Sequence, residues 1–177
     1  IRRPRPDDYQ IKKAVEVIKS SKNPIIISGG GVFYSDAMEE LSDFAKKHNI
    51  PVTQTVMGYS TMKRDHSHFL GPIGGLGGKA ANNMAKKTDL AIAVGTKLAD
   101  FTTGSWANFE NPNFKLVSIN AARFDANKHM AQAVVGDAKV SLSELSLALG
   151  SWKAEDSWNK KAQMELKSWD EYVDKES

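Results

Sequence analysis

The sequence contains no cysteine, which excludes disulfides, thiolate metal sites and a cysteine nucleophile. It has no apolar run long enough to cross a membrane and no signal-peptide pattern, so a cytoplasmic location is the default expectation. The 24 basic and 21 acidic residues are interspersed, and no basic stripe alternates with aromatic residues. The chain is therefore not expected to bind nucleic acid, despite its net charge of +3.

Catalytic motifs are also scarce. The sequence has no G-x-S-x-G elbow, no H-E-x-x-H motif and no conspicuous pair of carboxylates. One H-x-H pair occurs, His66 and His68, but a metal site needs further converging ligands. We interpret this pair as part of a polar loop, and we expect neither a metal site nor a catalytic residue in this chain.

The length of 177 residues fits one globular domain, with or without an appendage. Residues 1–7 are rich in arginine and proline, which favours an extended, solvated incoming linker. Residues 8–150 form the predicted domain. Residues 151–177 are predicted to form an amphipathic tail helix, which either folds back onto the domain or docks on a neighbouring one. Its apolar stripe consists of Trp158, Ala162, Leu166, Trp169 and Val173.

Within the domain, short apolar segments alternate with amphipathic ones. The predicted strands are Pro24–Ser28, Val52–Val56, Phe69–Ile73, Leu90–Val94, Lys115–Asn120 and Ala133–Val135. The predicted helices are one capped by Asp7 or Asp8, Ser35–His48, Gly78–Lys87 and one capped by Asp137. This alternation predicts an α/β fold: a doubly wound, Rossmann-like parallel sheet of about six strands with helices on both faces.

Open α/β sheets bind ligands beyond the carboxyl ends of their strands. The candidate residues for a nucleotide crevice at that edge are Gly29, Gly30, Gly31, Gly95, Thr96, Lys97 and Asn120. The run from Gly29 begins like G-x-G-x-x-G, but Tyr34 occupies the third glycine position, and no acidic residue ends the second strand to hold a ribose. The glycines either form a tight turn that binds nothing, which we favour, or belong to a non-standard nucleotide site.

A second glycine run, from Gly75 to Ala80, fits G-x-G-x-x-A. No strong strand is predicted directly before it, and Ala80 replaces the Ser or Thr of a P-loop. We interpret it as a chance match, although a helix that starts near Gly78 offers free N–H groups to an anion.

Several segments together resemble the central domain of thiamine-diphosphate-dependent enzymes of the acetolactate synthase and pyruvate oxidase group. The resemblance covers about residues 11–149 and rests on Pro24–Val32, Ile50–Val52, Gly58, Asp65-His66, Gly71, Gly74, Ala80–Asn82, Asp89–Gly95 and Val135–Ala138. It implies a DHS-like NAD/FAD-binding fold. It also implies an N-terminal domain with the activating glutamate and a C-terminal domain with the G-D-G motif for Mg²⁺ and diphosphate. The present chain is then the middle part, inactive alone, and its tail leads to the C-terminal domain.

A narrower set of segments resembles the trihydroxycyclohexanedione hydrolases of myo-inositol catabolism. The set consists of Ala93–Leu98, Asp100–Ser105, Asn111–Asn113, Ile119-Asn120 and Phe124–Ala126. This resemblance implies a parent enzyme that opens a cyclic 1,2-dione to a deoxyglucuronic acid, with thiamine diphosphate and Mg²⁺ as cofactors. It also implies that the full-length parent is a homo-oligomer.

Some enzymes of the wider group bind FAD or ADP in this domain. Lys97 stands where flavin-binding members tend to carry Arg, and Asn120 stands where they tend to carry Asp. We therefore expect a vestigial crevice with a structural role and no cofactor in this chain. The alternatives are an acetolactate-synthase-like central domain and a FAD- or ADP-binding regulatory module. A sirtuin-like deacylase is disfavoured because the zinc cysteines are missing.

Overall fold

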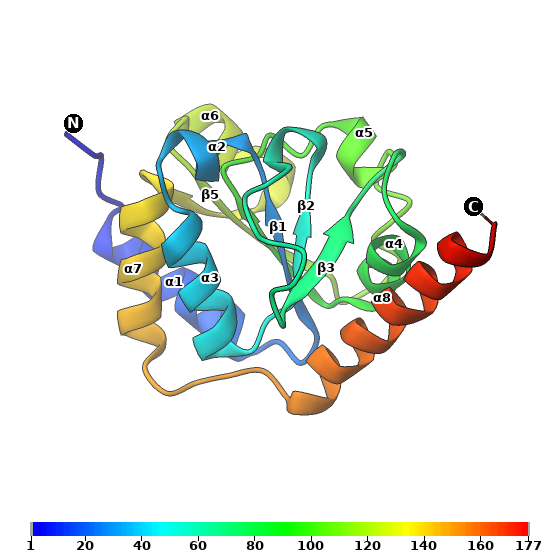
Figure 1. The fold of residues 1–177 in the computed structure, drawn as a ribbon. Helices are drawn as coiled ribbons and strands as arrows, with labels where there is room; N and C mark the ends of the chain where they lie inside the picture. Colours follow the sequence, from blue (N-terminus) through cyan, green and yellow to red (C-terminus); the bar gives the residue numbers. More distant parts are fainter. Residues whose placement is uncertain (1, 177) are drawn as a thin grey trace.

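Six parallel strands form the centre of the computed structural model, which describes residues 2–176. They are β1 (Pro24–Ser28), β2 (Val52–Gln54), β3 (Phe69–Pro72), β4 (Leu90–Val94), β5 (Lys115–Asn120) and β6 (Gln132–Val135). Their order in the sheet is β3-β2-β1-β4-β5-β6 (Figure 1). This is the order of a doubly wound fold, and the prediction of a Rossmann-like sheet is confirmed.

Helices cover both faces of the sheet (Figure 1). One face carries α1 (Asp8–Lys19), α3 (Met38–His48) and α7 (Ala138–Leu149), and the other carries α4 (Lys79–Lys87) and α8 (Asp156–Glu176). The short elements are α2 (Gly30–Tyr34), α5 (Asp100–Thr103), α6 (Arg123–Ala126), η1 (Val56–Gly58) and η2 (Lys128–Met130). In Figure 1, α2, α5 and α6 lie at the top, beyond the carboxyl ends of the strands.

The continuous apolar run of β1 is explained by burial on both faces. Ile26 packs into the core under α1, α3 and α7, whereas Ile25 and Ile27 pack into the core under α4 and α8. All three are fully buried. Each buried isoleucine contributes about 1.5–3 kcal/mol to the stability of the fold. This one strand therefore stabilises the cores on both faces of the sheet.

Element boundaries differ from the sequence prediction around the turns. The helix predicted from Ser35 begins at Met38, because Asp36 has a φ of 50° and interrupts the helical backbone. The glycine turn continues directly into α2. The strand predicted to reach Val56 ends at Gln54 and passes into η1, and the predicted loop from Phe101 includes one turn of α5.

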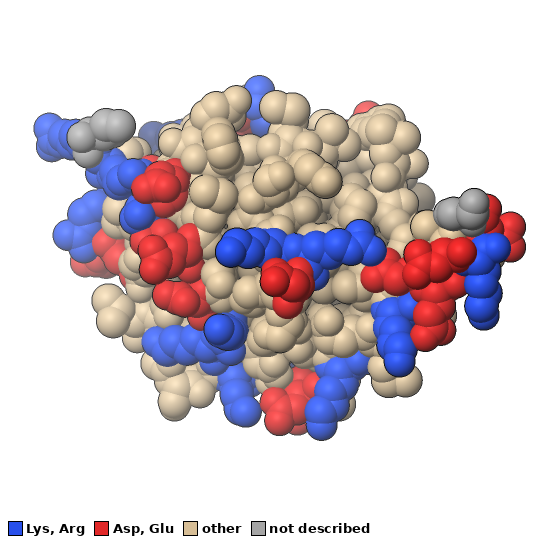
Figure 2. Space-filling view, viewed as in Figure 1, with Lys and Arg blue, Asp and Glu red and all other residues tan. Residues whose placement is uncertain are grey.

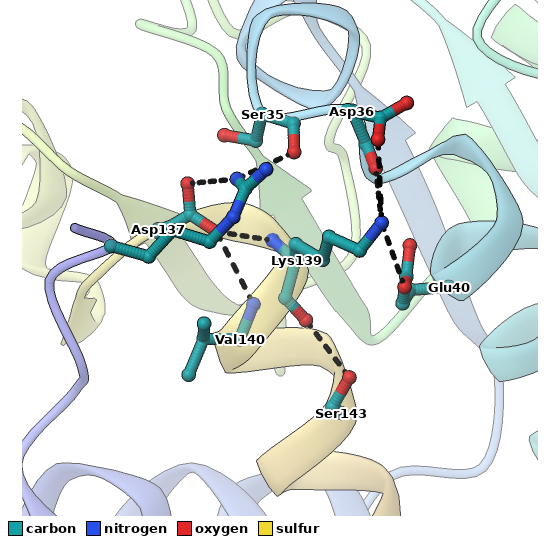
Figure 3. Close-up of polar contacts among 8 residues, drawn as sticks. Ser35, Asp36, Glu40, Asp137, Lys139, Val140 and Ser143 are labelled. Atoms are coloured by element: carbon teal, nitrogen blue, oxygen red, sulfur yellow. Dashed lines mark hydrogen bonds and ion pairs between the residues drawn. The ribbon is translucent and has the colours of Figure 1, made fainter. Parts of the chain in front are cut away.

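The first residues are extended and partly exposed, but they are also bound to the domain. Pro6 is buried, and the Arg3 guanidinium donates to the Ser35 carbonyl at 2.7 Å and to the Asp137 carboxylate at 2.9 Å. Asp137 is also the N-cap of α7, accepting from the Lys139 amide at 3.0 Å (Figure 3). The Lys139 ammonium lies between Asp36 and Glu40, at 3.4 and 3.3 Å. This network joins the incoming segment, α7 and the α2–α3 turn.

The tail helix α8 folds back onto the domain along α4 and β3. Trp158 is buried and its indole N–H donates to the Pro24 carbonyl at 2.8 Å. Ala162 is fully buried, and Leu166 packs against Gly71. The predicted apolar stripe therefore supplies part of the core beneath β1 and β3.

Within residues 2–176, no helix has both the length and the apolar character that a bilayer crossing requires.

Candidate functional site

A cleft of about 390 Å³ lies beyond the carboxyl ends of β1, β2 and β4. Five of the seven predicted crevice residues line it, namely Gly30, Gly31, Gly95, Thr96 and Lys97. The other two residues contact Thr96: Gly29 packs against its side chain, and Asn120 bonds its backbone carbonyl. The structure thus brings all seven together, because parallel strands place their following loops at one edge.

The three glycines after β1 permit backbone-to-backbone packing with the loop after β4. The Gly31 N–H donates to the Gly95 carbonyl at 2.9 Å. A Cβ atom on Gly31 would lie 2.6 Å from the Gly95 Cα, and one on Gly29 would lie 2.6 Å from the Thr96 Cβ. Gly95 itself has a φ of 61°. Glycine is required here because the two loops approach too closely for a side chain.

Asn120 holds the loop after β4 from the other side. Its amide nitrogen donates to the Thr96 carbonyl at 3.3 Å, and its amide oxygen accepts from the Ala122 N–H at 2.9 Å. The side chain therefore connects the ends of β4 and β5, and both ends of its amide have partners inside the protein. A nucleotide ribose would have to compete with these bonds.

The hydrogen bond between Gly31 and Gly95 bears directly on phosphate binding. In dinucleotide-binding folds, the backbone N–H groups of this turn face the pyrophosphate. Here the Gly31 N–H is already paired with a protein carbonyl. The local geometry thus favours a sealed turn over a phosphate cradle.

The outer part of the cleft is apolar, and we call its four exposed residues the apolar rim: Tyr34, Val56, Met57 and Phe101. Met57 is 70% exposed and Tyr34 is 80% exposed. Among the described residues that line the cleft, Lys97 is the only charged one. Figure 2 shows a largely uncharged surface over α2 and η1. This rim was not predicted from the sequence, although large apolar residues in the short segments after strands were the available signal.

The second glycine run follows β3, which matches the strand predicted over Phe69–Ile73, and it opens α4. Its end is covered: the Trp169 indole nitrogen lies 3.2 Å from the place of a Cβ on Gly78. An anion at this helix end would meet an aromatic ring. The Glu165 carboxylate lies farther along α4, where it is bound to Lys87 at 3.0 Å.

The paired histidines lie apart from the cleft and have protein partners. His68 is 7% exposed and its Nε2 contacts the Asn49 amide oxygen at 2.9 Å, while His66 Nε2 contacts Ser42 Oγ at 3.0 Å. Burial is the main cause that lowers the pKa of His68 to about 4, and His66 and Lys46 act in the same direction. Residues 2–176 contain no group of three or more His, Asp or Glu side chains arranged to hold a metal ion.

Comparison with known proteins identifies the family. The family described as thiamine pyrophosphate enzyme, central domain, matches residues 11–145. Curated relatives carry the name 3D-(3,5/4)-trihydroxycyclohexane-1,2-dione hydrolase. The protein from Clostridium perfringens strain 13 is 42% identical over 171 residues, which cover 97% of this chain and 27% of the relative.

Two further relatives with that name give the same result. The Clostridium tetani protein is 45% identical, covering 82% of this chain and 23% of the relative, and the Bacillus licheniformis protein is 42% identical, covering 86% and 24%. The chain thus spans about a quarter of the length of the curated relatives it matches. Its six-stranded sheet and the match over residues 11–145 agree, and the chain belongs to the family of thiamine pyrophosphate enzyme central domains.

Proposed function

We propose that this chain is the central domain of a thiamine-diphosphate-dependent hydrolase that opens the ring of trihydroxycyclohexane-1,2-dione to 5-deoxyglucuronate. The relatives that carry the hydrolase name, at 42% to 45% identity, support this substrate over that of an acetolactate-synthase-like enzyme. The division into a linker over 1–7, a domain over 8–150 and a tail over 151–177 belongs to the same proposal.

Within that enzyme the chain has a structural role: it spaces the two cofactor domains and shapes the substrate entrance. Its own residues do not fit thiamine diphosphate with Mg²⁺, since the described part of the chain lacks a cluster of metal-ligating side chains and Lys97 is the one charged residue lining the cleft. The cofactor and the metal then belong to flanking N- and C-terminal domains. We extend the proposal to a homo-oligomeric parent enzyme in the cytoplasm.

The observation that carries the structural role is the bond from the Gly31 N–H to the Gly95 carbonyl, at 2.9 Å. It occupies a donor that a nucleotide phosphate would need. The regulatory alternative requires FAD or ADP to bind in this cleft. The turn disfavours that binding because its Gly31 N–H is not available to the phosphate. Calorimetric titration of the isolated chain with FAD and with ADP should give no saturable heat, and tight binding of either would establish the alternative.

The apolar rim is the proposed contact surface for the flanking domains. Its four residues are exposed although they are large and apolar, and such clusters mark interaction sites. The first and last described segments both reach this edge: Arg3 contacts Ser35 after α2, and Trp169 contacts Gly78 before α4. Flanking domains attached there are positioned to cover the rim.

A substitution in the parent enzyme tests this role. Met57→Asp places a charge in the rim and should lower ring-opening activity by about tenfold or more, as expected for a central interface residue. Met164→Asp is the matched control, because Met164 on α8 is 71% exposed, compared with 70% for Met57. Thermal unfolding of the isolated chain should be the same for both variants. Equal activity of the two parent variants would contradict the proposed contact, and ring opening by the isolated chain would contradict its structural role.

A further inference from the structure

A second cavity, of about 560 Å³, lies near the amino ends of β5 and β6. This volume is in the range of small-molecule sites, which are typically 300–1,000 Å³. Trp106, Phe114 and Leu116 form its apolar walls, and the fully exposed Met130 lies at its edge. We call it the aromatic cavity. None of the residues assigned to the cleft lines it.

The aromatic cavity arises because the connection from β4 to β5 contains only one helical turn, α5. Residues 104–114 have no regular helix, and aromatic side chains cover the sheet there instead. The rings of Phe109 and Phe114 lie 4.6 Å apart between centroids, and Trp106 lies 5.7 Å from Phe109.

Two pairs of residues beside the hollow have left-handed backbone conformations that favour glycine. Ser105 and Trp106 have φ values of 52° and 70°, and His129 and Met130 have values of 61° and 55°. Each such residue costs about 1 kcal/mol or more, and clusters of them occur at ligand-binding sites. The strained pairs meet through the Trp106 and His129 rings, whose centroids are 4.6 Å apart.

The polar groups at the cavity are mostly hydrogen-bond donors without strong partners. Within residues 2–176, the Trp106 indole N–H and the His129 ring make no hydrogen bond. In this part of the chain, the Lys115 ammonium has one hydrogen-bond partner, Ser20 Oγ, at 3.2 Å. None of the described residues that line the cavity is acidic. An open apolar hollow with an exposed ammonium group and an unpaired indole N–H at its edge complements a ligand with a flat apolar body and an anionic end.

We propose that the aromatic cavity binds a small monocarboxylate with an aromatic or alicyclic body. The body packs against Trp106 and Phe114, and the carboxylate faces Lys115. This inference does not depend on the proposed function of the parent enzyme, because the cavity and the cleft share no lining residue.

Calorimetry with benzoate as the probe tests the proposal, on this chain and on its longer parent. We expect saturable binding to both. Lys115→Met keeps the aliphatic stem and removes the charge, so it should weaken benzoate binding by about tenfold. The matched control is Lys97→Met in the cleft, which should leave the affinity unchanged. Benzamide is the neutral isostere and should bind the unmodified chain about tenfold more weakly than benzoate. Its affinity should be the same for the unmodified chain and for Lys115→Met.

Trp106→Phe keeps an aromatic wall and removes the indole N–H, and it should weaken binding several-fold without loss of folding. Near-ultraviolet circular dichroism checks that each variant is folded. Absence of saturable benzoate binding would overturn the proposal, as would equal affinity of the unmodified chain and Lys115→Met. Binding to the isolated chain that is lost in the parent would also overturn it, because the cavity would then be an interface between domains.

Discussion

The cleft and the aromatic cavity differ in how their polar groups are used. The cleft lies at the sheet edge where doubly wound folds bind ligands, yet its Gly31 N–H and its Asn120 amide are paired within the protein. The aromatic cavity lies away from that edge, and its Lys115 ammonium and Trp106 indole are largely unpaired.

This difference shows that a position in the fold does not by itself make a ligand site. A ligand gains free energy from donors and acceptors that the protein leaves unpaired, and donors already bonded at 2.9 Å offer little. The fold determines which loops lie together. The hydrogen bonds among those loops determine whether polar groups remain available to a ligand.

The largest effect should come from breaking the sealed packing of the cleft. Gly95→Ala combines a positive φ with a Cβ 2.6 Å from the Gly31 Cα, and it should lower the free energy of unfolding by about 4 kcal/mol. Gly29→Ala introduces the clash without a positive φ and should cost about 3 kcal/mol. Urea denaturation measures both values.

Gly104→Ala is the matched control for the positive φ. Gly104 has a φ of 59° in the left-handed helical region, and the atoms nearest the place of its Cβ belong to the Asn108 side chain, at 3.3 Å. It should cost about 1 kcal/mol. Similar losses for Gly95→Ala and Gly104→Ala would show that the two loops are not tightly packed, and the contrast between cleft and cavity would then fail.

Acid should destabilise the scaffold that both regions share. The pKa of His68 is about 4 in the folded protein and about 6.5 when unfolded. The unfolded chain thus binds more protons between these values, so stability is full above pH 6.5 and is lost as the pH falls to about 4. The loss should reach at most about 3 kcal/mol.

Thermal unfolding across that pH range measures the loss, and His68→Gln is the control. Glutamine keeps a donor for the Asn49 amide oxygen but does not titrate. If the stability of His68→Gln falls with pH as that of the unmodified chain does, His68 is not the cause of the loss. Ligand titrations of the cleft and the cavity are best compared above pH 6.5, where this contribution is constant.

The smallest effect should come from Asn120→Asp. The carboxylate keeps the bond from the Ala122 N–H and loses the donation to the Thr96 carbonyl, which should cost about 1 kcal/mol. Asn127→Asp is the control, since Asn127 is exposed and its lost bond to the Arg123 carbonyl is replaced by water. Equal stability of the two variants, together with new ADP binding by Asn120→Asp, would show that the cleft is open to a nucleotide.

Much of the fold could be predicted from local patterns. The apolar runs at β1, β4 and β5 give correct strands because residues buried on both faces leave an unbroken signal. Asp7 and Asp137 are correct N-caps because their side chains bond amides two or three residues away. The turn boundaries were less predictable, since the φ of 50° at Asp36 leaves no pattern in neighbouring residues.

The candidate site was predictable only in part. The seven crevice residues could be chosen because each ends or follows a strand, and strand ends converge in a parallel sheet. The sequence did not show which residue each glycine contacts. Gly31 and Gly95 are 64 positions apart, and their pairing depends on the order of β1 and β4 in the sheet.

By itself, the sequence determined the doubly wound class and the edge at which the loops gather, because burial and capping act over a few residues. Only the tertiary structure decided that Gly31 donates to Gly95 and that Trp106, Phe114 and His129 surround a hollow. Both results depend on backbone and ring groups brought together from distant segments. Whether a polar group stays free for a ligand is settled by those long-range neighbours and not by the residue type.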